Sequence, residues 1–213
     1  MKLKINEIFY SIQGESSFSG LPCVFVRLTY CNLRCSYCDT EYAFYNGKDM
    51  SLSEIIIEVK KHPTQLVMIT GGEPLLQKKS IDLMQCLIDE KYSVMLETSG
   101  SLSLQNVPKE VIKIVDFKCP SSKMKEKNMW SILNDIDKKD EIKFVIGDKE
   151  DYDWSRSKIN RYKLYDKCQI LFSPVYGKID MKDLCDWVLS DGLKVRLQTQ
   201  LHKFIWGPDK KGV

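Results

Sequence analysis

The stretch TYCNLRCSYCDT, residues 29–40, decides the fold and points to the chemistry of this chain. It begins where VFVRLTY, residues 24–30, ends, and that apolar run predicts a buried strand. Cys31, Cys35 and Cys38 therefore lie in a loop at the carboxyl end of a strand, where parallel α/β folds collect their functional groups. A [4Fe–4S] cluster normally takes four cysteine ligands, so three neighbouring thiolates leave one iron open to a small chelating ligand.

Other uses of the cysteines fit less well. Structural zinc sites need four closed ligands, and the chain has no second CxxC or HxxxH pair. Eight cysteines could form four disulfides in a secreted protein, but three of them within eight residues suit a metal better. We expect the remaining five, which lie mostly in apolar stretches, to be small buried hydrophobes: Cys23, Cys86, Cys119, Cys168 and Cys185.

Strand and helix patterns alternate along the rest of the sequence. Besides residues 24–30, strands are predicted at residues 66–70, 93–98, 111–117, 141–146, 168–174 and 193–200. Amphipathic helical segments are predicted at residues 51–62, 80–91, 129–139 and 181–192. About six such repeats favour right-handed βαβ crossovers and a mostly parallel sheet. The fold class is therefore α/β, an open and shortened TIM-like (β/α)6 barrel rather than a closed eight-unit one.

Composition limits the possible partners. With 213 residues, 43% of them hydrophobic, the chain is expected to form a single domain over residues 1–213. Its net charge of +3 is too small to argue for nucleic acid or an anionic membrane, although a small anionic substrate fits. The sequence has no apolar run of membrane-spanning length, and its N-terminus lacks the features of a secretory signal. We therefore expect a cytoplasmic protein.

A second motif, TGGEP at residues 70–74, follows the predicted strand at residues 66–70. Glycine pairs alone supply many ordinary turns. Together with CxxxCxxC and the aromatic Tyr37 before the last cysteine, however, TGGEP resembles the paired motifs of the radical S-adenosylmethionine (SAM) superfamily. The resemblance implies reductive cleavage of SAM to methionine and a 5′-deoxyadenosyl radical, which removes a hydrogen atom from the substrate.

Further segments resemble one family within that superfamily. FYSIQGES (residues 9–16), CDT (38–40), LETSG (96–100) and TQLHKFIWG (199–207) are similar to those of the 7-carboxy-7-deazaguanine synthases. The resemblance implies that 6-carboxy-5,6,7,8-tetrahydropterin is contracted to 7-carboxy-7-deazaguanine with release of ammonia, and that SAM is used catalytically. It also implies a homodimer, a flavodoxin- or ferredoxin-type reductant, and a cluster loop at residues 31–40.

The same resemblance implies the ligand-binding residues. Thr40 would be the protein ligand to Mg²⁺, although a threonine in this position is more often a turn residue. The residues expected to contact SAM are Tyr37, Cys38, Asp39, Gly72, Glu73, Ser99, Ser121, Ser173, Pro174, Val175 and Tyr176. Those expected to contact the substrate are Ile12, Gln13, Gly14, Glu15, Arg27, Thr70 and His202. No catalytic side chain is expected beyond the cofactor.

Several of these residues have simpler interpretations. Arg27 offers a planar fork for a carboxylate, and its simpler interpretation is a surface ion pair. The QGE segment is expected in a loop and would otherwise be an ordinary turn, and His202, expected near the end of a late strand, would be a histidine of the barrel rim. Residues 199–213 are expected to cap the substrate, with the role of Val213 left open.

Two alternative functions remain at this point. A glycyl-radical-enzyme activating protein shares the three-cysteine motif and a small barrel, but it needs a broad groove for a protein loop. An iron–sulfur electron carrier or a zinc-stabilised binding module has no use for TGGEP, and a carrier would be expected to supply a fourth thiolate.

Overall fold

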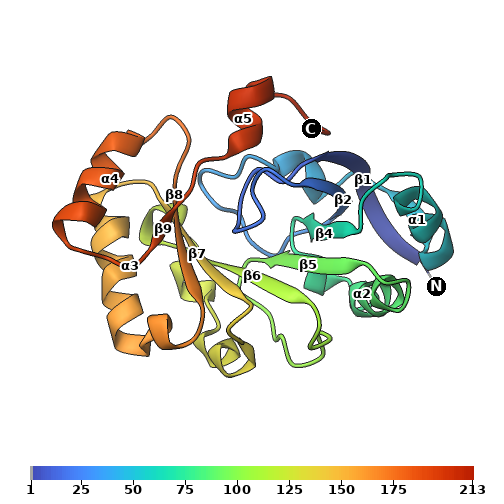
Figure 1. The fold of residues 1–213 in the computed structure, drawn as a ribbon, viewed down its shortest axis with the longest axis horizontal. Coiled ribbons are helices and arrows are strands. Elements are labelled where there is room, and N and C mark those ends of the chain that lie inside the picture. The colour runs from blue at the N-terminus through green and yellow to red at the C-terminus, as the bar shows by residue number, and fades with distance from the viewer. Residues whose placement is uncertain (1) are drawn as a thin grey trace.

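The computed structural model describes residues 2–213, which form one mixed sheet with helices packed on its outer face (Figure 1). Within these residues the strand order is β3-β1-β2-β4-β5-β6-β7-β8-β9. From β2 to β9 all neighbours pair in parallel, whereas β1 pairs antiparallel with both β2 and β3. The strands are β1 (Lys2–Ile12), β2 (Pro22–Leu28), β3 (Lys48–Ser51), β4 (Leu66–Gly71), β5 (Ser93–Thr98), β6 (Ile112–Phe117), β7 (Glu141–Ile146), β8 (Gln169–Pro174) and β9 (Arg196–Leu197).

Three of the five described α-helices have a clear start signal in the sequence. Ser51 caps α1 in a capping box with Glu54, and Asp148 and Asp180 cap α3 and α4 by accepting backbone N–H groups. The α-helices are α1 (Leu52–Val59), α2 (Ser80–Asp89), α3 (Lys149–Tyr162), α4 (Met181–Ser190) and α5 (Leu201–Trp206). Short 3₁₀ turns are η1 (Glu41–Phe44), η2 (Pro74–Leu76), η3 (Pro120–Ser122), η4 (Lys125–Lys127), η5 (Trp130–Asp135) and η6 (Leu164–Asp166).

Alternation along the strands separates two environments. On β7, Ile142, Phe144 and Ile146 join the main core under the helices, whereas Glu141, Lys143 and Val145 point to the inner face. The bottom of the inner face is a small apolar cluster of Cys23, Leu66, Met68, Met95 and Ile114. The polar residues of the inner face therefore lie above an apolar floor, toward the carboxyl ends of the strands.

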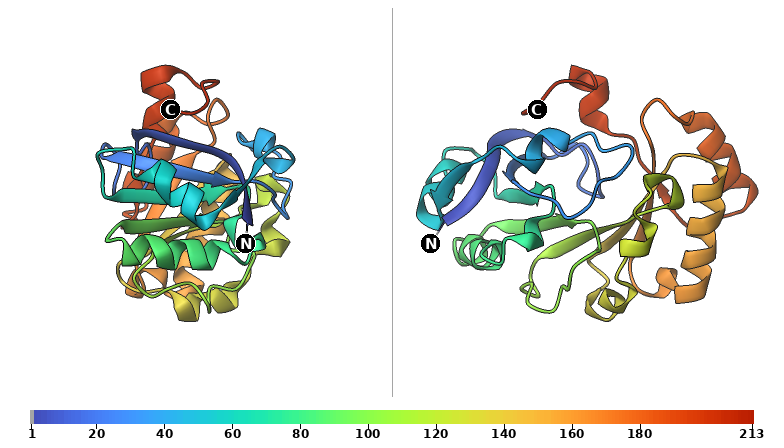
Figure 2. Two further views of the ribbon diagram at one scale, coloured as in Figure 1. Left: turned by 90° about the vertical axis from the view of Figure 1, so that its right-hand side faces the viewer. Right: turned by 180° about the vertical axis from the view of Figure 1, so that it is seen from behind.

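The sheet is strongly curved, and α1 to α4 cover its convex side (Figure 2). The C-terminal α5 instead crosses to the other side, where it lies above the ends of β1 and β2 (Figures 1 and 2). Among the described residues, no helix has the length and apolar character needed to cross a membrane.

The expected open α/β partial barrel is confirmed, with differences at individual elements. The helix expected at residues 129–139 is only the 3₁₀ turn η5, because Trp130 is held by stacking on Phe117 and Tyr162, at centroid distances of 4.4 and 4.5 Å. The strand expected at residues 193–200 shrinks to the two residues of β9, and α5 follows. Strands β1 and β3 and helix α3 were not among the predicted elements.

Of the five cysteines expected to be buried hydrophobes, Cys23, Cys119 and Cys168 are buried. Cys86 and Cys185 lie on α2 and α4 with partly exposed side chains, so this expectation was wrong for them. Both helices keep only one face against the sheet, and these two positions lie at the border of that face.

Candidate active site

A cavity of about 880 Å³ opens at the carboxyl ends of the parallel strands. The cluster loop, the segment after β1, the ends of β2 and β4 to β8, and the C-terminal segment all contribute to its wall. All predicted site residues line it except Glu73 and Ser121. Residues from most of the chain length are thus gathered around one space, as the rule for parallel α/β folds requires.

Cys31, Cys35 and Cys38 line this cavity together. Ser36 fixes the loop between them: its N–H donates to the carbonyl oxygen of Ser122 (3.1 Å) and its hydroxyl to that of Ser121 (2.6 Å). The loop that carries the cysteines is therefore anchored to the end of β6.

The thiols are spread along the wall rather than gathered at a point. Within residues 2–213, no three His, Cys, Asp or Glu side chains lie close enough to hold a single metal ion. A [4Fe–4S] cluster makes a different demand, because its cysteines ligate different iron atoms. Burial raises the pKa of all three thiols, that of Cys38 to about 11, and the positive charge of iron would favour their thiolate forms.

The TGGEP loop packs directly on the cluster loop. The Gly72 N–H donates to the carbonyl of Leu28 (3.2 Å), and that of Glu73 donates to the carbonyl of Tyr30 (2.8 Å). A Cβ at position 72 would press on the Tyr30 backbone and lie 2.7 Å from the Cβ of Cys31. Only glycine lets the two loops approach so closely.

Glu73 is fully buried beneath this loop. Its carboxylate accepts hydrogen bonds from the N–H groups of Leu75 and Ser99 (3.0 and 2.8 Å) and from the hydroxyls of Thr98 and Ser99 (2.9 and 2.6 Å). The side chain thereby ties the end of β4 to the end of β5 and turns away from the cavity, which Gly72 and Ser99 line instead.

Ser121 has a similar supporting position on η3. Its hydroxyl and its N–H both donate to the buried carboxylate of Asp151 on α3, the N–H at 2.8 Å. Since its carbonyl accepts from Ser36, Ser121 links α3 to the cluster loop.

The other residues expected at SAM lie around the cysteines. The Tyr37 hydroxyl donates to the carbonyl of Val145 (3.4 Å), which holds the ring against the ends of β7 and β8. Asp39 accepts from Lys203 (2.8 Å), Gln200 (3.1 Å) and the Thr40 hydroxyl (2.9 Å). Burial opposes ionisation of Asp39, but the Lys203 charge outweighs it and lowers the pKa of this carboxyl. The cluster loop is thereby bound to α5.

Arg27 lies lower in the cavity, on the inner face of β2. Its Nε donates to the Glu7 carboxylate (2.7 Å), which also accepts from the Tyr42 hydroxyl (2.8 Å). The guanidinium lies over the rings of Phe9 and Tyr42, at 5.7 and 5.9 Å. No group within residues 2–213 bonds its two terminal nitrogens. Arg27 therefore forms an ion pair through Nε, and its two terminal nitrogens still offer a bidentate donor to the cavity. Both interpretations given to this residue in the sequence thus apply.

The QGE segment follows β1 and packs against α5. Gln13 is 3% exposed; its Oε1 accepts from the Glu15 N–H (3.2 Å), and its Nε2 finds no partner among the described residues. The Gly14 carbonyl accepts from the Leu201 N–H (3.0 Å), and any Cβ at position 14 would collide with the His202 ring.

His202 lies in the first turn of α5 and not near the end of a strand, which corrects the expectation. Gly207 ends α5 after only 6 residues, so the apolar pattern of this helix was too short to predict it from the sequence. Burial lowers the pKa of His202, and the imidazole is therefore neutral at pH 7.

Comparison with known proteins identifies the family to which a chain with this site belongs. The Radical SAM superfamily model matches residues 26–117. The chain is 47% identical to the 7-carboxy-7-deazaguanine synthase of Koribacter versatilis, over 99% of this chain and 100% of that protein, and 44% identical to the synthase of Chlorobaculum tepidum, over 99% and 97%. The chain belongs to the 7-carboxy-7-deazaguanine synthase family. As a radical SAM lyase it uses a [4Fe–4S] cluster and SAM.

A solved structure carries the same fold as this member of the synthase family. The crystal structure of QueE from Escherichia coli superimposes with a TM-score of 0.78 at 22% identity, over 95% of each chain. The shared architecture includes the open partial barrel on which the cavity is built.

The synthase cavity also contains charged residues that the sequence analysis missed. Lys143 donates to Glu15 (2.8 Å) and to Glu97, and lies 3.7 Å from Asp116, which is also paired with Lys118 (2.8 Å). Their signal was the presence of charged residues within otherwise apolar strands, in LETSG, VDFK and EIKFVI. Buried charges in such strands are rare unless they are paired or functional.

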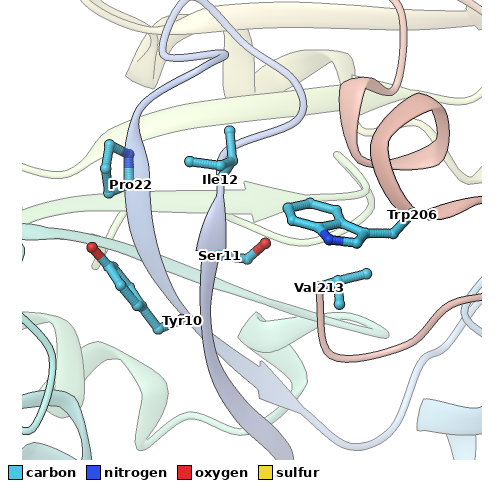
Figure 3. A pocket seen from close by; sticks show the side chains of 6 residues that line it. All are labelled: Tyr10, Ser11, Ile12, Pro22, Trp206 and Val213. Atoms are coloured by element: carbon cyan, nitrogen blue, oxygen red, sulfur yellow. The ribbon is translucent and has the colours of Figure 1, made fainter.

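A second hollow of about 200 Å³ adjoins the first and is mainly apolar (Figure 3). It lies between the end of β1 and the C-terminal segment of the synthase, with Trp206 and Val213 facing Ser11 and Ile12. Because Ile12 and Val213 line both hollows, the chain end is folded back over the site.

Proposed function

We propose that this synthase contracts the ring of 6-carboxy-5,6,7,8-tetrahydropterin to 7-carboxy-7-deazaguanine with loss of ammonia. The observation that carries the proposal is the unpartnered edge of Arg27, which lines the same cavity as the three cysteines. A planar guanidinium held by Glu7 and two aromatic rings is preorganised to bind a carboxylate through two parallel hydrogen bonds.

The cofactors would occupy the upper part of the cavity. Cys31, Cys35 and Cys38 would hold the cluster, and Tyr37, Asp39, Gly72, Ser99 and residues 173–176 would surround SAM. When bound, this pair supplies an electron and a carbon radical that removes a hydrogen atom from substrate carbon. The buried Glu73 and Ser121 would act indirectly, by holding the loops that contact SAM.

The substrate would lie beneath the cofactors on the polar inner face. Arg27 would bind its carboxylate, while Gln13 and Glu15 would meet the amide and amine edge of the pterin. Thr70 would also contact the carboxylate, and its register pairing with Arg27 across β2 and β4 supports this role. His202, with a neutral imidazole, and Gly14 would close the cavity around the pterin. Ile12 would supply an apolar contact.

Thr40 would ligate Mg²⁺ together with substrate and water oxygens, since this hard cation keeps several waters. Its hydroxyl donates to Asp39 (2.9 Å), which leaves the lone pairs of the hydroxyl oxygen for the ion. The oxygen donors of Thr40 and Asp39 on the cavity wall support such a site.

For the molecule as a whole, we infer one radical SAM domain over residues 1–213, with a cluster loop at residues 31–40 and a substrate-capping segment at residues 199–213. We also infer a homodimer, a cytoplasmic location, and a flavodoxin- or ferredoxin-type electron donor. Exposed apolar side chains of α5, Phe204 and Ile205, support an interface between copies of the chain.

An anaerobic assay tests the function. Reconstituted protein would be given dithionite, SAM, Mg²⁺ and 6-carboxytetrahydropterin, and the product followed by mass spectrometry. We expect 7-carboxy-7-deazaguanine with wild-type protein and with Cys185→Ala, and none with Cys35→Ala. Cleavage of SAM without the deazaguanine product would refute the proposed substrate.

A further inference from the structure

Lys143 lies at the centre of the inner face, where three elements converge. It is 4% exposed, and its ammonium group donates to Glu15 (2.8 Å) from the segment after β1 and to Glu97 from β5. Asp116 of β6 lies 3.7 Å away and is shared with Lys118. A single cation therefore joins carboxylates that are far apart in the sequence.

The electrostatic balance keeps these groups charged. Burial by itself would lower the pKa of Lys143, but the facing carboxylates, Glu15 first, raise it well above its usual range. Burial would likewise raise the pKa of Glu15, and the charge of Lys143 outweighs this effect. Removing one partner of such a buried group leaves the charge of the other uncompensated.

The same carboxylates are accessible from the cavity. Glu15 and Glu97 both line it, and their side chains are 20% and 31% exposed. Nearby, the buried amide Nε2 of Gln13 has no partner among the described residues. This part of the cavity wall thus combines ionised acceptors with one unpaired donor, which complements the N–H groups and the oxo group of a 2-amino-4-oxopyrimidine ring.

We propose that Lys143 is a positioning residue for the substrate: it holds the Glu15 and Glu97 carboxylates side by side as acceptors for the amino-pyrimidinone edge of the pterin. This inference rests on the proposed function, whose substrate carries that edge. It assigns Lys143 to substrate affinity and not to the cofactor, because its hydrogen bonds go to Glu15, which the proposed function gives to the substrate, and to Glu97.

Lys143→Met tests the proposal, with Lys113→Met as a matched control. Lys113 is also a buried lysine, 3% exposed, but it pairs with Asp140 (2.9 Å) and does not line the cavity. Dissociation constants for 6-carboxytetrahydropterin and for SAM would be measured on each reconstituted variant by anaerobic calorimetry, with kcat and KM from the product assay.

For Lys143→Met we expect the pterin dissociation constant and KM to rise roughly 10- to 100-fold, as for the loss of a charge-assisted contact, while SAM affinity changes less than about 2-fold. Lys143→Arg should recover part of the lost pterin affinity. If Lys143→Met does not fold, the same constants are measured on Lys143→Arg alone. The Lys113→Met protein should bind both ligands normally despite lower stability.

Unchanged pterin affinity in folded Lys143→Met protein, or an equal loss of pterin and SAM affinity, would overturn the assignment. If only Lys143→Arg folds, a pterin KM equal to the wild-type value together with a reduced kcat would also overturn the assignment. If the wild-type protein itself neither binds nor converts the pterin, the proposed function fails first, and the role of Lys143 falls with it.

Discussion

Arg27 illustrates how one residue is prepared for a ligand before the ligand arrives. The Glu7 carboxylate accepts a hydrogen bond from the Nε of Arg27, and the rings of Phe9 and Tyr42 fix the plane of its guanidinium. Little conformational entropy is then left to lose when a carboxylate binds the terminal nitrogens. The sequence could not indicate this, because Glu7 and Phe9 belong to the unpredicted strand β1.

Arg27→Ala should therefore weaken substrate binding selectively. We expect the dissociation constant of the carboxylated pterin to rise about 100-fold or more, since a bidentate charge-assisted pair is lost. SAM binding, measured in parallel by calorimetry, should stay within about 2-fold. A variant that loses SAM affinity but keeps pterin affinity would contradict the role given to Arg27.

His202 gives α5 a defined pH dependence. Its folded pKa lies below the unfolded value of 6.5, because burial disfavours the charged imidazolium. The unfolded segment then binds more protons as the pH falls, so the stabilisation is fully present above pH 6.5 and is lost below it.

Hydrogen exchange of residues 199–207 at pH 7.5 and 5.5, corrected for intrinsic rates, measures this effect. We expect protection to fall at pH 5.5 in the wild-type protein and to fall less in His202→Gln. Equal loss of protection in both proteins would assign the pH dependence to another group.

Among elements, α3 shows how a helix outside the cavity supports the site. Asp151 on its first turn is completely buried and accepts hydrogen bonds from the Ser121 N–H, the Ser121 hydroxyl and the Gly147 N–H. Through Ser121 and Ser36, this carboxylate positions the loop of the cluster cysteines. The strongly charged sequence of α3, KEDYDWSRSKINRY, has only a weak apolar stripe, which explains why periodicity did not predict it.

Asp151→Ala should lower the free energy of unfolding by about 2–4 kcal/mol, because buried donors lose their acceptor. The half-exposed Asp153 on the same helix, paired with Lys149 at 2.7 Å, provides the control. Asp153→Ala should change the stability by less than about 0.5 kcal/mol in urea denaturation. Similar losses for both variants would argue against the anchoring role of Asp151.

For the whole molecule, the sequence predicted the open barrel, and nearly all the site residues predicted from it line the cavity, because strand-end motifs in a parallel fold must meet at one edge. The ion-pair network around Lys143 could not be predicted from the sequence, because its partners Glu15, Glu97 and Asp116 come from separate elements. The position of α5 could not be predicted either, because tertiary contacts of Lys203 and Leu201, and not local periodicity, hold that short helix in place.

The central claim is that the cavity binds the carboxylated pterin with its acid group on Arg27 and its amino-pyrimidinone edge on Glu15 and Glu97. A crystal structure of the reconstituted protein with SAM and 6-carboxytetrahydropterin, grown without oxygen, tests it most directly. We predict density for the carboxylate within hydrogen-bonding distance of both terminal nitrogens of Arg27, below SAM. A pterin bound in the reverse orientation, or outside this cavity, would contradict the account.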